Sequence, residues 1–169
     1  MHATSTPLDS AGKVHTSWLN HKDLARFAPL PIRLVIGFGF MQHGLAKLTR
    51  GPDLFAATLH GLAVPAPHVM AWLTIVIEIL GGLAVFLGCL IPLFAVPMAT
   101  VLLVAIFSVH LHYGFSSIKL ISVTDGRPLF GPPGYECDLL YIASIAALFV
   151  GGPGPLSVDH LLFRRRNLR

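Results

Sequence analysis

The chain has 169 residues, of which 54% are hydrophobic and only 12% are charged, and its mean hydropathy is +0.71. Water alone cannot satisfy the surface of such a chain, so the composition argues for a lipid bilayer as its medium. The length suits one domain and is short for two. The net charge of +4 would indicate anionic partners in a soluble protein, but here the positions of the basic residues carry more information.

Both ends of the chain differ in composition from the apolar middle. Residues 1–28 are polar and contain no continuous apolar stretch, so we expect a polar tail and no cleavable signal peptide. Residues 153–169 form a basic, amphipathic tail in which the apolar side chains at 161–163 can rest in the membrane interface beside the arginines at 164–166.

Between the tails, four segments are predicted to span the membrane: residues 29–48, 68–88, 91–113 and 133–151. The strictly apolar part of the fourth, residues 139–150, is too short for a hydrocarbon layer of about 30 Å at about 1.5 Å per residue. We therefore expect this helix to begin near Pro133, with Glu136 and Asp138 in a first turn that favours carboxylates. The predicted fold is all-α, an integral membrane four-helix bundle over residues 29–152.

The basic residues predict how this bundle is oriented. Eight lie on the side of the two tails and four on the other, which puts both termini in the cytoplasm of a multi-pass plasma (inner) membrane protein. The eight are Lys13, Lys22, Arg26, Arg33, Arg164, Arg165, Arg166 and Arg169, and the four are Lys47, Arg50, Lys119 and Arg127. The connections 49–67 and 114–132 then face outward; they are rich in Gly and Pro, and we predict no strands in them.

Glu78 is the sharpest functional signal, because it lies midway along the second apolar segment. An unpaired, ionised carboxylate at that depth costs several kcal/mol. At helical spacing Glu78 falls on a stripe of small residues opposite a stripe of leucines, so it is predicted to face the bundle interior. It is either a functional group or a neutral residue that holds helices together, and the first interpretation is favoured.

Other polar residues are predicted at a similar depth. His43 and Lys47 lie one turn apart on one helix face, and His43 is either a satisfied interior residue or a proton-handling group. His110 is expected to face the bundle, with His112 in the interface. Because His43, Glu78, His110 and Glu136 come from four segments and all lie between the membrane middle and the outer surface, we predict a polar pocket that opens outward.

Several chemistries are disfavoured. Cys89 and Cys137 are predicted at opposite membrane faces and no C-x-x-C is present, which argues against a thiol oxidase. No dinucleotide or phosphate loop and no nucleophile elbow occurs. Deep histidines on facing spans that could hold two haems are lacking, and the basic residues lack the aromatic neighbours typical of nucleic-acid binding.

Four stretches together resemble the DoxX family of membrane proteins: "RLVIGFGFMQHGLAKL", "EILGGLAVFLG", "VHLHYGF" and "GPPGYECDLLYIASIAALFVGGPGPLSVD". The resemblance implies a four-helix membrane bundle, and in the DoxD type a subunit of a thiosulfate:quinone oxidoreductase. Carried over residue by residue, it picks out Arg33, His43, Gly44, Lys47, Glu78, Gly82, His110, Gly114, Glu136 and Tyr141. The thiosulfate reaction itself is not carried over, because His112 and the long 116–134 connection are less general features.

The leading hypothesis is therefore a membrane subunit of a quinone-linked oxidoreductase of sulfur or redox metabolism. Glu78 and His43 would move protons, while the quinone or a small anion would contact other members of the set. Those binding candidates are Lys47, His110, Glu136, Tyr141 and Arg33. Electrons would have to come from a soluble partner subunit or a bound cofactor.

Two alternatives remain at this level. One is a non-enzymatic scaffold or small-solute transporter, favoured by the lack of a redox motif and by small-residue faces that also suit a homo-oligomer. The other is a metal site built from His43, Glu78, His110 and Glu136, because imidazole and carboxylate suit zinc, iron or copper.

Overall fold

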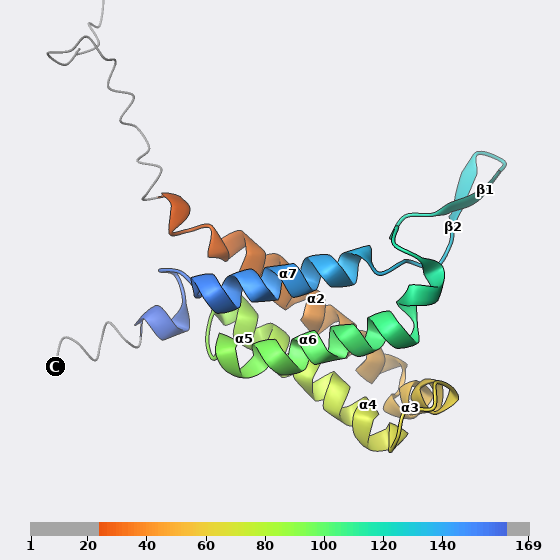
Figure 1. The fold of residues 1–169 in the computed structure, drawn as a ribbon, viewed down its shortest axis with the longest axis horizontal. Coiled ribbons are helices and arrows are strands. Elements are labelled where there is room, and N and C mark those ends of the chain that lie inside the picture. Colours follow the sequence, from red (N-terminus) through yellow and green to blue (C-terminus); the bar gives the residue numbers. More distant parts are fainter. Residues whose placement is uncertain (1–23, 162–169) are drawn as a thin grey trace, which may run out of the picture.

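The computed structural model describes residues 24–161. Lys13, Lys22, the four arginines at 164–166 and 169, and most of both predicted tails lie outside these residues. The described chain is mainly helical (Figure 1). Its helices are α2 (Pro29–Arg50), α3 (Pro52–Gly61), α4 (Pro67–Val76), the π-helical turn η1 (Ile77–Gly81), α5 (Gly82–Leu87), α6 (Ile91–Ser108), the 3-10 turn η2 (His110–Tyr113) and α7 (Glu136–Gly151). Its strands are β1 (Leu120–Thr124) and β2 (Arg127–Phe130).

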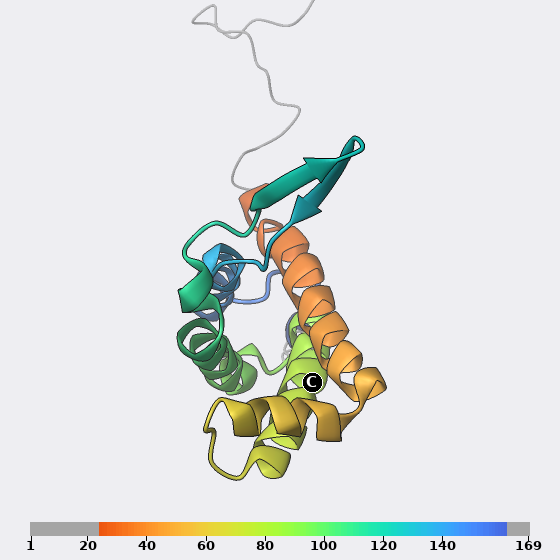
Figure 2. The same cartoon turned by 90° about the vertical axis from the view of Figure 1, so that its right-hand side faces the viewer.

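Four long helical segments within residues 24–161 pack together: α2, the continuous helix α4–η1–α5, α6 and α7 (Figures 1 and 2). In this part of the chain, α4–η1–α5 and α6 are long and apolar enough to cross a membrane, with 21 and 18 residues. Helix α7 is shorter, with 16 residues, and α2 includes Arg33, Lys47 and Arg50 among its 22. Proline in the first turn of α2, α4 and α6 fits positions where no backbone N–H is needed.

The ends of the predicted helices are mostly close to those observed. The second segment shifts by one residue, to 67–87, and the third changes after Ser108 to a 3-10 turn. The fourth begins at Glu136, and the predicted start near Pro133 is wrong. The N–H groups of Gly134, Tyr135 and Glu136 donate instead to carbonyls of residues 114–116, so the backbone is held in a loop until α7 begins.

The two long connections contain structure that was not predicted. Helix α3 follows α2 directly, and the expectation of no strands is wrong because β1 and β2 form an antiparallel hairpin. Its turn places Asp125 and Gly126 at φ of 51° and 72°. Two consecutive left-handed residues are what a tight hairpin turn requires, and Asp-Gly is a preferred pair for it.

The inward stripe of the second helix is confirmed. Glu78, Gly81, Val85 and Ala71 are buried, while leucines on the opposite face are exposed. Helices α2 and α5 meet at a glycine contact, since a Cβ on Gly37 would lie 2.7 Å from the carbonyl oxygen of Gly82. The apolar core collects around this contact; it comprises Ile36, Phe40, Val85, Ile91, Ala95, Met98, Leu102, Ile145 and Leu148.

Candidate functional site

Glu78 lies in the π-helical turn η1, and only 4% of its surface is exposed. A π-helical turn carries one extra residue per hydrogen-bonded loop and is frequent at functional sites. The turn ends at Gly81 and is followed by Gly82, both in close contact with neighbouring helices. The carboxylate is therefore placed in the interior of the helix packing, as its inward stripe predicted.

The direct partner of Glu78 is Lys47 of α2. The Lys47 Nζ atom donates to both carboxylate oxygens, at 2.7 Å each. Gly44, one turn earlier on α2, makes this approach possible, because a Cβ there would lie 3.0 Å from Cβ of Glu78. Lys47 was expected to contact the ligand, and its pairing with the deepest acid was not predicted.

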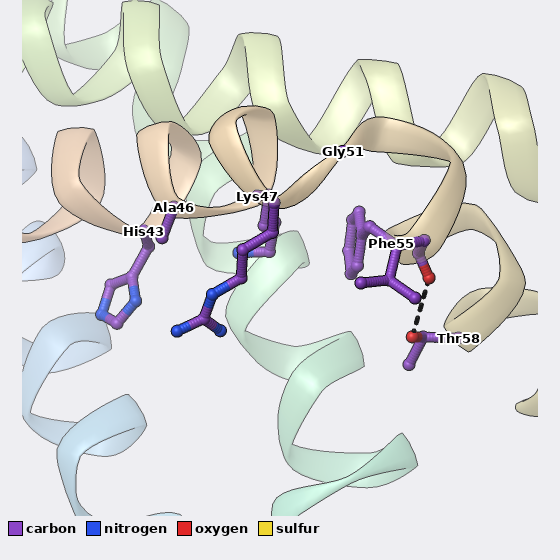
Figure 3. Close-up of a pocket in the computed structure, with 8 residues that line it drawn as sticks. His43, Ala46, Lys47, Gly51, Phe55 and Thr58 are labelled. Carbon is purple, nitrogen blue, oxygen red and sulfur yellow. Dashed lines mark hydrogen bonds between the residues drawn. The ribbon is translucent and has the colours of Figure 1, made fainter.

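A cavity of about 290 Å³ opens beside this pair, between α2 and α3 (Figure 3). Helix α2 supplies three basic residues, His43, Lys47 and Arg50. Lys47 follows His43 by one helical turn and Arg50 follows it by two, so all three lie on one face. Helix α3 supplies Leu54, Phe55 and Thr58. The cavity thus combines cationic donors with apolar walls.

Phe55 connects the cavity to the ion pair. Its ring centroid lies 5.3 Å from Lys47 Nζ, a distance at which an ammonium is attracted to the face of an aromatic ring. The ammonium therefore has the Glu78 carboxylate and the Phe55 ring among its neighbours. Sequence reasoning missed Phe55, because the helix that carries it was not predicted.

His43 faces the other side of the cavity toward α7. Its ring centroid lies 6.3 Å from that of Tyr141, in an edge-to-face arrangement, and Tyr141 also packs edge-on against Phe40 at 5.4 Å. The phenol fits against α2 because Gly39 has no side chain: a Cβ there would overlap the Tyr141 hydroxyl. Of the predicted binding residues, Tyr141 and Lys47 are thus neighbours of His43 or Glu78.

His110 belongs to a different cluster. Its Nδ1 forms a hydrogen bond with Oδ2 of Asp138, which joins η2, just after α6, to the first turn of α7. Asp138 was predicted only to favour the helix dipole, and its sequence position carries no sign of this partner. Glu136 accepts a hydrogen bond from the backbone N–H of Ser117, so it holds the loop before α7.

Arg33 lies at the opposite end of α2 from Lys47, 14 positions away and about 21 Å along the axis. Its two terminal nitrogens donate to the carbonyl oxygens of Pro153 and Leu156, at 2.8 and 2.7 Å. Gly88 makes room for it, since a Cβ there would lie 2.0 Å from Arg33 Nη1. The expectation that Arg33 contacts the same ligand as His43 is corrected: it fastens the C-terminal segment.

The expectation of one shared pocket is corrected as well. His43, Glu78, His110 and Glu136 form three separate sets of contacts. Within residues 24–161, no three His, Cys, Asp or Glu side chains are grouped so that they could hold a metal ion. Equal depth in four helices did not bring the side chains together, because depth does not fix the rotation of each helix.

The arrangement around Lys47 has a definite chemical capacity. A charge-assisted, two-oxygen contact stabilises a buried carboxylate that would otherwise be costly. Because Lys47 also lines the cavity, an anion or a polar oxygen bound there would compete with Glu78 for the ammonium. Lys47 thus both pairs with the buried acid and lines the cavity.

Comparison with known proteins agrees with the resemblance seen in the sequence. A family model described as DoxX matches residues 28–111, which include both Lys47 and Glu78. An uncharacterized membrane protein of Mycobacterium tuberculosis is 29% identical over 141 residues, which cover 79% of this chain and 80% of the relative. No solved structure matches. The chain belongs to the DoxX family of membrane proteins.

Proposed function

We propose that this protein is a four-span subunit of a quinone-linked oxidoreductase in the plasma membrane, with both termini in the cytoplasm. The spans would be α2, α4–η1–α5, α6 and α7, which form one four-helix bundle. The cavity beside Lys47 would open toward the outer side and receive the polar end of a quinone. The observation that carries the proposal is the pairing of the buried Glu78 with the half-buried Lys47, which also lines a basic cavity.

The pairing supports α2 as a spanning helix. Lys47 is basic, but its charge is neutralised by Glu78 at 2.7 Å, which lowers the cost of placing both at membrane depth. The Arg33 guanidinium is likewise held by two carbonyl oxygens. The Leu90 N–H, in the connection between α5 and α6, donates to Asp159 of the C-terminal segment. The segment after α7 therefore lies at the same end of the helices as the α5–α6 connection. This is the arrangement expected for an even number of spans.

The cavity suits a quinone head group in size and chemistry. Its volume of about 290 Å³ is near the lower end of ligand pockets, about 300 Å³, so it fits one ring and leaves a long tail outside. Phe55 and Leu54 offer apolar contacts, while His43 and Arg50 offer donors for a quinone oxygen. An isoprenoid tail could run along the exposed apolar helix faces.

Each residue then has a role in binding or proton transfer. His43 and Arg50 orient the ring through its oxygens, and Phe55 packs against it. Lys47 turns partly from Glu78 to the bound oxygen, which leaves the carboxylate free to take a proton. When bound, the quinone would accept two electrons from a soluble redox partner subunit, and the two protons that its reduction consumes would pass from water through Glu78 to the quinone oxygens.

The test is quinone binding and membrane reductase activity in proteoliposomes. Wild type is compared with Glu78→Gln, His43→Ala and the control His68→Ala, using ubiquinone and menaquinone analogues. His68 is a suitable control because it is 72% exposed and lies outside the cavity. We expect His43→Ala to weaken analogue binding about tenfold, the effect of about 1.4 kcal/mol, and Glu78→Gln to reduce turnover more than binding.

Unchanged binding and unchanged activity in both Glu78→Gln and His43→Ala would remove the proposal. Equal loss in His68→Ala would also contradict it, because that result would mean that the effect does not come from the cavity.

A further inference from the structure

The β1–β2 hairpin plays no part in the proposed quinone site. Every residue in both strands is exposed. An isolated two-stranded hairpin is only marginally stable in water. The hairpin therefore needs a surrounding medium or surface that covers part of it.

The pairing register divides the hairpin into two unlike faces. Leu120 pairs with Phe130, and Val123 pairs with Pro128. The register shifts between Leu120 and Ser122, where Ile121 has no paired residue and the strand bulges. Because paired residues share a face and neighbours along β2 alternate, Val123 and Pro128 lie on one face, and the Leu120–Phe130 pair joins it across the bulge. The other face carries Ser122, Thr124, Arg127 and Leu129, so the hairpin is amphipathic even though both faces are open.

The position of the hairpin indicates what covers the apolar face. It leaves the helices where α6 ends and α7 begins, and it stands to the side opposite α3 (Figures 1 and 2). The exposed apolar surface of α6 continues into it through Phe107, Leu111, Phe115 and Ile118, of which Ile118 is 76% exposed. Exposed apolar side chains therefore recur along the chain from α6, a helix long and apolar enough to cross a membrane, to the hairpin, which favours lipid as the medium that covers the apolar face.

Charge and backbone chemistry place the hairpin at that surface and no deeper. Lys119 precedes β1 and Arg127 opens β2, against one acid, Asp125, in the turn. Two basic residues beside an apolar face suit anionic head groups. The outer edges of a two-stranded sheet leave backbone groups unpaired, and these need water or head groups rather than hydrocarbon.

We propose that the β1–β2 hairpin lies on the bilayer surface at this end of the helices, with Leu120, Val123, Pro128 and Phe130 in the lipid interface. The hairpin thus anchors this end of α6 and α7 to lipid. This assignment depends on the membrane environment of α6 and is independent of quinone chemistry.

The test uses spin labels on the two faces of each strand, in a Cys89→Ser/Cys137→Ser background. The pairs are Val123→Cys against Thr124→Cys, and Phe130→Cys against Leu129→Cys. Each protein is reconstituted in phosphatidylcholine vesicles with and without phosphatidylglycerol. Collision rates with oxygen, which partitions into lipid, and with a water-soluble nickel chelate are then measured.

We expect the ratio of oxygen to nickel collisions to be several-fold higher at 123 and 130 than at their neighbours, and higher still with phosphatidylglycerol. Equal nickel access on both faces would overturn the proposal and leave the face free for a protein partner. Spin coupling between labels at 123 that disappears on dilution with unlabelled protein would also overturn it, in favour of a second copy of the chain. The second strand pair repeats the test independently if one variant folds poorly.

Discussion

Each end of α2 carries a buried or half-buried cation, and the two cations have different kinds of hydrogen-bond acceptors. Arg33 is 2% exposed and donates to two backbone carbonyls of the C-terminal segment. Lys47 donates to a carboxylate on the neighbouring helix and also borders a cavity. The carbonyl acceptors of Arg33 are neutral and fixed, so this contact fastens the C-terminal segment. The acceptor of Lys47 is an ionisable carboxylate beside a cavity, so this contact can be broken by protonation or by a bound ligand.

The Arg33 contact is therefore expected to affect mainly stability, and the Lys47 contact both stability and ligand binding. A guanidinium held by carbonyls has no proton to exchange at ordinary pH. An ammonium held by a carboxylate can lose its partner to a ligand or to a proton. These two cations of α2 therefore differ in their partners, and only the Lys47 end is assigned a role in the proposed function.

The largest effect is expected from breaking the Lys47–Glu78 pair. Lys47→Met leaves a buried carboxylate without a partner and should cost about 3–5 kcal/mol of unfolding free energy. Glu78→Leu should cost less, because the Lys47 side chain is 24% exposed and can turn toward the cavity. The double variant should recover most of the loss, as measured by unfolding in mixed detergent micelles.

Additive single effects would contradict this prediction, since they would mean that the two groups do not interact. A Lys47→Met variant as stable as wild type would mean that Glu78 is solvated by other means.

Arg33→Leu should destabilise the protein by about 2–3 kcal/mol, because hydrogen bonds from a charged donor to two carbonyls are lost. Arg33→Lys should recover only part of this, since one ammonium lacks the fork that reaches both oxygens. Protease access to the C-terminal segment checks the mechanism. If Arg33→Leu weakened quinone-analogue binding but left protease cleavage at the wild-type level, Arg33 would act on the ligand site and would not fasten the C-terminal segment.

Gly82→Ala tests the contact between α2 and α5 that lies between those ends. The new methyl group would meet the Gly37 carbonyl oxygen at 2.7 Å and Met41 N at 2.8 Å, so the helices must separate. We expect a loss of about 1–2 kcal/mol. Gly61→Ala is the matched control, because a methyl group at that position would have no neighbour within 4 Å; equal melting temperatures for the two variants would refute the close contact.

The smallest effect concerns Cys89, at the Arg33 end. Burial and then the nearby Asp159 carboxylate raise the pKa of its thiol above the ordinary value. Less thiolate is present at a given pH, so alkylation is slow. In a Cys137→Ser background, Asp159→Asn should accelerate maleimide labelling modestly near pH 8; a slower reaction would mean that the carboxylate does not act on the thiol.

Much of the fold followed from the sequence, because apolar length and terminal prolines mark helices reliably. The segments beginning at Pro29, Pro67 and Ile91 were predicted within one residue. The hairpin was missed although its signal was present: β-branched residues in "LISVT" followed by Asp125-Gly126 are typical of a strand and a tight turn. The Gly and Pro residues that surround these strands hide the pattern, because they are typical of irregular loops.

The candidate site could be predicted only in part. The small-residue stripe correctly put Glu78 in the interior, but its partner depends on how α2 is rotated against η1, which no local pattern fixes. Gly44 lets the two helices approach closely at this point. His110 failed for the same reason, since its partner Asp138 is determined by the angle between α6 and α7.

Infrared difference spectroscopy of the reconstituted protein tests the central claim most directly. Adding a quinone analogue should change the carboxyl absorption as Lys47 shifts toward the ligand and Glu78 gains a proton. The change should persist in His68→Ala and vanish in Glu78→Gln. No carboxyl change in wild type at saturating analogue, or an unaltered change in Glu78→Gln, would contradict the account.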